Sequence, residues 1–340
     1  MPTFTNRTVN VTSHTLSTTL TLSQLASALD ARRPGANRTS GWGAVDDPAT
    51  RLERDGAVGS LPPSVQPAAG YIPERLTARY FSWRYEPVND AAGQAANNNW
   101  ILDAVDIEVS AHGVNTYLVL YSALHADLVD VTTGRLTASL RNAVVATDAS
   151  AQLRDDSFLA FSSSDVFLWL AHRAEARTPI GGSVRVDSMA RVDAEEDARQ
   201  FRRSTLSGVV DMQRITFLNA IAQASPLGPA VVTITEPNAN GLLDRFEARL
   251  WRQGAFSLLM TNTIVRDTPD GDAARLEAVH RWAYSYIPLI NRAYAADQRW
   301  GTQQRDALVI SKRVELESYY QTLAQAHPRW SEWVAGTLRV

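Results

Sequence analysis

The sequence predicts an α+β fold in which two divergent α-β-β-β-α units with antiparallel sheets are followed by a helical C-terminal region. Three observations predict it: short segments of alternating apolar and polar residues joined by turn residues, amphipathic helical spacing around them, and recurrence of this pattern in the second half of the chain. With 340 residues and 45% apolar content, the chain is large enough to bury a core in each unit.

The first unit begins with a strand and a helix. Residues 4 to 12 alternate as a strand does, and Leu22–Asp30 has the spacing of a short amphipathic helix. The segment from Arg33 to Pro73 is rich in proline and glycine and has little periodicity, which predicts a long loop or linker. Loops of this length are uncommon in compact domains, so we expect this one to be mobile or functional.

Three strands follow in the first unit. Aromatic strand formers fill Arg79–Glu86, and the polar run Asn97–Asn99 separates this strand from the next. Ile101–Ser110 alternates apolar residues with acidic ones, which predicts one buried face and one face in water. His112-Gly113 supplies a tight turn into Tyr117–Tyr121, so the sequence predicts a hairpin here.

Helical spacing recurs along the rest of the chain. The predicted helices cover residues 134–145, 165–173, 212–224, 276–294 and 308–323. Pro288 lies within the fourth of them and predicts a kink or a break. Val231–Ile234 is a predicted strand that stops at Glu236-Pro237, much as the first aromatic strand stops at Glu86-Pro87.

The two halves share specific spacings that favour an internal duplication. Ile101-Leu102-Asp103 and Leu242-Leu243-Asp244 each end ten residues before a glycine, Gly113 or Gly254, that leads into an apolar strand. Further matches at a constant offset of 140 join Asp130, Arg135, Leu136, Ala138 and Arg141 to Asp270, Arg275, Leu276, Ala278 and Arg281. The alternative is a chance likeness between two antiparallel hairpins.

These patterns divide the chain into six segments. They are residues 1–33 (strand and helix of the first unit), 34–75 (loop or linker), 76–150 (the rest of the first unit), 151–205 (a connecting region with a helix), 206–300 (the second unit) and 301–340 (a C-terminal helical region).

Composition narrows the classes of function. The net charge of −3 argues against bulk nucleic acid or an anionic membrane as the main partner. The chain has no cysteine, which excludes disulfides and thiol chemistry. Lys312 is its only lysine beside 32 arginines, a skew typical of a GC-rich gene, so we expect a bacterial source. We see no signal peptide and no apolar run that could cross a membrane, so we expect a cytoplasmic protein.

The candidate catalytic residues are acidic residues and a histidine of the first unit. Asp106 and Glu108 lie two apart on a predicted strand, so both carboxylates leave the same face, as a divalent metal site requires. His125 and Asp127 repeat this spacing after the hairpin and would complete a mixed site if the segments met. The simpler interpretation, which we favour, places Asp106 and Glu108 on the solvent side of the strand. No cofactor is predicted, although this set would suit a divalent metal.

Arginine and aromatic residues are the candidate binding residues. Trp83 and Arg84 belong to the aromatic strand and could stack on nucleic-acid bases. Arg202 and Arg203 follow the acidic run that starts at Asp193 and could contact phosphates, although a solvated, self-pairing helix face is the simpler interpretation. Trp330 and Trp333 flank the last helix and form either the edge of the core or an aromatic contact patch.

Three functions are compatible with these features. Missing Gly-x-Ser-x-Gly, His-Glu-x-x-His and Gly-x-Gly-x-x-Gly motifs favour a non-catalytic binding or assembly subunit with a protein partner or a second copy of itself. The first alternative is a metal-dependent hydrolase or nuclease that uses Asp106, Glu108, His125 or Asp127. The second is a nucleic-acid-binding protein that uses Arg84, Arg202 and Arg203.

The order helix, three strands, helix resembles that of double-stranded RNA-binding domains, and a strand before the helix makes it similar to the repeating unit of DNA sliding clamps. The resemblance concerns topology alone and covers about half of the chain. Domains of the first family begin their second helix with lysines, where this chain has Asp270-Gly271-Asp272.

Overall fold

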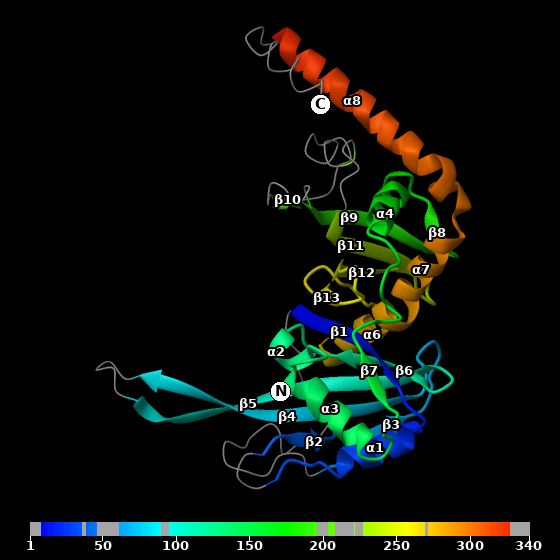
Figure 1. Cartoon of the computed structure of the whole chain (residues 1–340). Coiled ribbons are helices and arrows are strands. Elements are labelled where there is room, and N and C mark those ends of the chain that lie inside the picture. The colour runs from blue at the N-terminus through cyan, green and yellow to red at the C-terminus, as the bar shows by residue number, and fades with distance from the viewer. Residues whose placement is uncertain are drawn as a thin grey trace. The chain divides into compact units, whose positions relative to one another are not determined.

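The computed structural model describes residues 8–35, 39–45, 61–89, 95–195, 203–207, 221, 227–268 and 271–326. The chain has a mixed α+β fold and splits into two compact units (Figure 1). Unit 1 contains Met1–Ala160, Gln253–Thr261 and Asp267–Tyr286, and unit 2 contains Phe161–Arg252, Asn262–Arg266 and Ile287–Val340.

Unit 1 is an antiparallel sheet with helices, and its strands lie in the order β13-β1-β6-β5-β4-β2. Two short strands pair outside this order, β3 with β4 and β7 with β1. The elements are β1 (Thr8–Ser17), α1 (Leu22–Asp30), β2 (Gly41–Gly43), β3 (Ser64–Gln66), β4 (Arg75–Asn89), β5 (Ala95–Gly113), β6 (Thr116–Tyr121), α2 (Ala126–Val129), α3 (Arg135–Val145), β7 (Gln152–Arg154), β13 (Phe256–Leu259), α6 (Asp272–His280) and the π-helical segment η3 (Arg281–Tyr286).

Capping explains where α1 begins. Thr21 accepts a hydrogen bond from the backbone N–H of Gln24, and the Gln24 side chain accepts one from the backbone N–H of Thr21. Leu22, Leu25 and Leu29 then face the core at helical spacing. The predicted helix over Leu22–Asp30 is confirmed to the residue.

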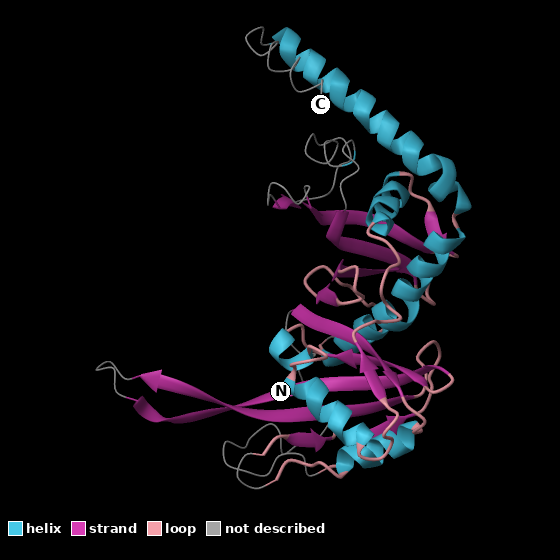
Figure 2. Cartoon of the chain, viewed as in Figure 1, coloured by secondary structure: helices cyan, strands magenta, loops and turns pink. Residues whose placement is uncertain are grey.

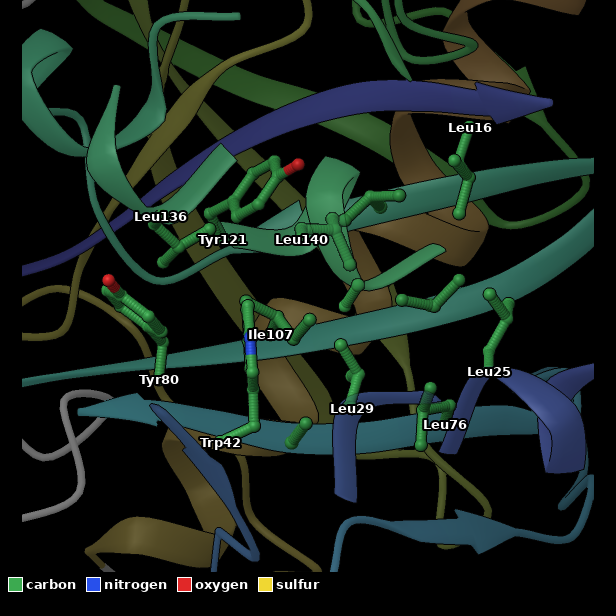
Figure 3. Close-up of a cluster of buried hydrophobic side chains, with 14 of the residues drawn as sticks. Leu16, Leu25, Leu29, Trp42, Leu76, Tyr80, Ile107, Tyr121, Leu136 and Leu140 are labelled. Carbon is green, nitrogen blue, oxygen red and sulfur yellow. The ribbon is translucent and has the colours of Figure 1, made fainter. Parts of the chain in front are cut away.

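The main core of unit 1 lies between one face of the sheet and helices α1 and α3 (Figure 3). Ile107 of β5, Tyr121 of β6 and Leu136 of α3 are fully buried there. Trp42 also enters this core and donates a hydrogen bond from its indole N–H to Ser139. Trp42 belongs to the segment predicted as a loop or linker, so part of that segment is a structural strand.

Unit 2 contains a second antiparallel arrangement, β10-β9-β11-β12, with β8 paired to β9. Its elements are α4 (Asp165–Glu175), β8 (Pro179–Gly181), β9 (Val184–Glu195), β10 (Arg203–Ser207), β11 (Leu227–Pro237), β12 (Leu243–Leu250), α7 (Ile287–Ala296), the π-helical segment η4 (Trp300–Gln304) and α8 (Arg305–Ala326). Figure 2 distinguishes these helices from the strands.

Reciprocal aspartate–tryptophan hydrogen bonds fix α4 to the end of α7. Asp165 of α4 accepts from the indole N–H of Trp300 at 2.7 Å, and Asp297 accepts from that of Trp169 of α4 at 3.0 Å. Arg305 adds an ion pair to Asp165 at the first residue of α8. The first turn of α8 is therefore attached to α4 by buried or half-buried polar contacts.

Several sequence expectations need correction. Asn97–Asn99 do not separate two strands, because β5 runs through them and pairs with β4. Asp193 lies in strand β9, so the expected helix face is wrong at this position. The break predicted at Pro288 is confirmed, since the π-helical segment η3 interrupts the regular helix directly before α7 and Pro288 lies in the first turn of α7. The predicted helix 212–224 lies outside the described residues except for the buried Ile221.

Candidate functional site

Strands β4 and β5 extend well beyond the rest of the unit 1 sheet. They pair with each other from Arg75 opposite Ser110 to Asn89 opposite Ala95. Their other partners reach only the base: β3 and β2 pair with β4 up to Phe81, and β6 pairs with β5 from Ile107 onward. A last backbone hydrogen bond joins Ser122 to Asp106.

We call residues 82–89 and 95–105 the arm. Within the described part of the chain, no third strand pairs with these residues. Eight residues of extended chain span about 26 Å, at about 3.3 Å per residue. Figures 1 and 2 show the two strands twisting away from the sheet as a narrow ribbon.

The base of the arm is anchored in unit 1. Trp83, a candidate binding residue, is buried to 8% exposure next to fully buried Phe81. Its ring is therefore part of the anchor and is not an open stacking surface. Arg84 lies one residue further along β4.

The face of β5 expected in water is buried, so that expectation is wrong. Asp106 is fully buried and forms a bidentate ion pair with Arg79 of β4, at 2.5 and 3.0 Å. Glu108 is buried as well, because α6 and η3 pack over this face. Alternation predicted the apolar face correctly, but it contains no information about a second layer.

Glu108 is at the centre of a buried polar cluster. His280 Nε2 lies 2.9 and 3.0 Å from its two carboxylate oxygens, and Tyr284 donates to it at 3.3 Å. Arg75 Nε lies 3.6 Å away. Burial raises the pKa of Glu108, but the charge of His280, its hydrogen bond, Arg75 and Tyr284 together hold that pKa below its usual value.

His280 and Tyr284 were missed by the sequence reasoning. The two residues are four positions apart, on consecutive helical turns, so both side chains reach the Glu108 carboxylate. The available signal was a histidine on the apolar stripe that contains Leu276 and Ala283. Its partner is 172 positions away in sequence, so periodicity could not reveal it.

The other candidate residues lie apart from this cluster. His125 and Asp127 are exposed at the start of α2, and Asp127 contacts Arg135 at 3.5 Å. The described residues contain no group of three or more histidines and carboxylates that could hold a metal ion. Arg203 is the first residue of β10, whereas Arg202, Trp330 and Trp333 lie outside the described residues.

No model of a known protein family matches the chain, and no curated protein matches it. Among the helices described, none combines the length and the apolar character that a bilayer crossing demands.

Proposed function

We propose that this chain is a non-catalytic assembly subunit of a cytoplasmic complex and that it binds its protein partner through the arm. The observation that carries the proposal is a ribbon of two strands that continues past the sheet with no third strand among the described residues. An isolated two-stranded ribbon is marginally stable in water. Its outer edges carry backbone donors and acceptors, which are a template for pairing with another chain.

The buried carboxylates of unit 1 support a binding role over a catalytic one. Asp106 and Glu108 are engaged by Arg79 and His280, so the two β5 carboxylates of the candidate metal site have buried cationic or hydrogen-bonding partners. A carboxylate held in this way joins elements of the fold. The Arg79–Asp106 ion pair fixes the base of the arm, because these residues lie opposite each other on its two strands.

The proposal includes a pseudo-symmetric scaffold. The segments 75–145 and 227–280 have the same order of three strands followed by helix along the chain, which supports the duplication suggested by the matching spacings, while β11 and β12 belong to unit 2 and β13 and α6 to unit 1. The two glycines of that match differ in role, since Gly254 has a φ of 88° and Gly113 is outside the left-handed region. In such a scaffold, only the first of the two duplicated segments would carry the arm.

The test is to remove the arm without disturbing its base. Arg84 and Ile101 are cross-strand partners. Deleting residues 85–100 and joining this pair with Asn-Gly closes the ribbon with a favoured two-residue turn. We expect a melting temperature within a few degrees of the native one, with loss of assembly in light scattering and loss of proteins captured by the tagged chain.

The full-length chain and the shortened chain must be compared side by side. Equal molar mass and an identical set of captured proteins, identified by mass spectrometry, would show that the arm binds nothing and would overturn the proposal.

A further inference from the structure

The two edges of the arm are chemically different. In an antiparallel pair, the backbone groups of successive residues point alternately toward the partner strand and away from it. The Asp106 carbonyl accepts from Ser122, so it points away from β4. Pairing between β4 and β5 is regular from Arg75 to Pro87, so the residues of β5 with even numbers share this direction.

Proline supplies an independent check of this direction. Pro87 lies opposite Asn98 and has no N–H to donate, so its place in a ladder is at a position facing away from the partner. Asn98 therefore faces outward on β5, in agreement with Asp106. The outward backbone groups of the β5 edge belong to Asn98, Trp100, Leu102 and Ala104.

The β4 edge is protected and the β5 edge is not. Pro87 removes a donor from the β4 edge, and this stretch of β4 also contains the charged residues Arg84 and Glu86. These are the devices by which edge strands avoid pairing with other chains. Residues 95–102 of β5 contain no proline, no glycine and no charged residue. An undefended strand edge on a projecting ribbon is a site for strand addition.

The sequence of the β5 edge is suited to pairing with the same edge of a second copy. An antiparallel pairing of two copies about an axis through Asn98 places Asn97 opposite Asn99 and matches residues 95–101 with no charge on either strand. Asparagine amides carry both donors and acceptors, so identical amides can hydrogen-bond across such a pair. A two-fold axis generates this antiparallel arrangement automatically.

We propose that the β5 edge of the arm pairs with the same edge of a second copy of this chain, centred on Asn98. This inference rests on the proposed function and names its partner. The β5 strand of the second copy would lie along the same edge of β5 that β6 occupies further along the strand. Residues 95–101 of this edge lie beyond the end of β6. The result is a four-stranded ribbon in which every outward backbone group of residues 95–101 gains a partner.

Two substitutions at one cross-strand pair test which edge is used. Tyr85 and Trp100 are opposite each other, and each directs its N–H to its own outer edge. Trp100→Pro removes a donor from the β5 edge, and Tyr85→Pro removes one from the β4 edge, while both leave the ladder of the arm intact. We expect Trp100→Pro to weaken self-association at least tenfold in light scattering, and Tyr85→Pro to leave it within threefold.

A cysteine reports the register directly, because the chain has none of its own. Residues opposite each other in a hydrogen-bonded antiparallel pair have Cα atoms about 5.5 Å apart, within disulfide range. We expect Asn98→Cys to form a dimer on mild oxidation, with much less dimer from Thr116→Cys at the start of β6.

The outcomes separate this inference from the proposed function. A monomeric chain whose arm captures a different protein would overturn the second-copy inference and leave arm-dependent assembly standing. Equal weakening by Trp100→Pro and Tyr85→Pro, or equal cross-linking at positions 98 and 116, would also overturn it. A native chain that stays monomeric and captures no protein through the arm would overturn both.

Discussion

The Nε2 atom of His280 lies 2.9 and 3.0 Å from the two carboxylate oxygens of Glu108, so a helix near the end of unit 1 holds the strand that forms the arm. An ionised carboxylate has no proton to donate, which means that the Nε2 atom carries one. This pair is buried on both sides and joins β5 to α6. It also explains why an acidic alternation that looks solvent-facing in sequence is covered in the fold.

Removing the Glu108 carboxylate should destabilise the protein strongly. Glu108→Ala leaves His280, Arg75 and Tyr284 without their common acceptor in a buried site, which costs about 3–5 kcal/mol. We expect Glu108→Gln to cost less, because the amide oxygen still accepts one hydrogen bond. Asp127→Asn, at an exposed carboxylate, is the control and should change the free energy of unfolding by under about 0.5 kcal/mol in urea titrations. Equal midpoints for all three variants would contradict this account.

Stability should fall as the pH drops below about 6.5, the usual pKa of histidine. Burial lowers the pKa of His14, although Asp155, Asp130 and Asp156 act in the opposite direction. The unfolded chain then takes up a proton that the folded chain does not, so the free energy of unfolding declines with falling pH. Glu108, whose pKa is also lowered, adds a second decline below about pH 4.3, where the unfolded carboxylate binds its proton first.

Replacing His14 tests the first of these declines. We expect His14→Gln to reduce the slope of the free energy of unfolding between pH 7 and pH 5.5, relative to the native chain. Some slope should persist, because burial lowers the pKa of His112 and His172 in the same direction. If the His14→Gln variant had the same slope as the native chain, the first decline could not be assigned to His14.

The tryptophan hydrogen bonds of unit 2 should each contribute measurably to stability. Trp300→Phe removes the indole donor of Asp165, which keeps Arg305, and Trp169→Phe removes the indole donor of Asp297, which keeps Arg173. Each change should lower the free energy of unfolding by about 1–3 kcal/mol. Trp251→Phe, at a half-buried tryptophan, is the matched control with an expected cost below about 1 kcal/mol. Costs at or below that of the control would show that the indole N–H groups are dispensable.

Gly254 should tolerate no side chain. Its φ is 88°, and a Cβ atom would lie 2.7 Å from the backbone carbon of Leu159 and 2.8 Å from the nitrogen of Ala160. Gly241 has a similar φ of 75° but open space around it. In thermal unfolding, Gly241→Ala isolates the cost of backbone strain, about 1 kcal/mol, and Gly254→Ala adds the steric clash. Equal losses of melting temperature would mean that the close approach to Leu159 relaxes at no cost.

Local patterns predicted the helices well. The bounds of α1 follow from the capping residues Thr21 and Gln24 and from leucines at helical spacing, all within ten residues. The hairpin after β5 was also expected, although its left-handed residue is Asn115 and not Gly113. By contrast, the arm was not foreseen, because Asn97–Asn99 have the composition of a turn and enter a strand through pairing with β4.

The sequence by itself determined the α+β class, the alternation that buries Val105, Ile107 and Val109, and the absence of thiol chemistry, since each depends on residue type and near neighbours. Only the tertiary structure decided the surroundings of Glu108 and the reach of the arm. A carboxylate two residues from an apolar neighbour has the same local pattern whether water or His280 covers it. The difference is made by a helix 172 positions later, and contacts over that separation leave no periodic trace in the chain.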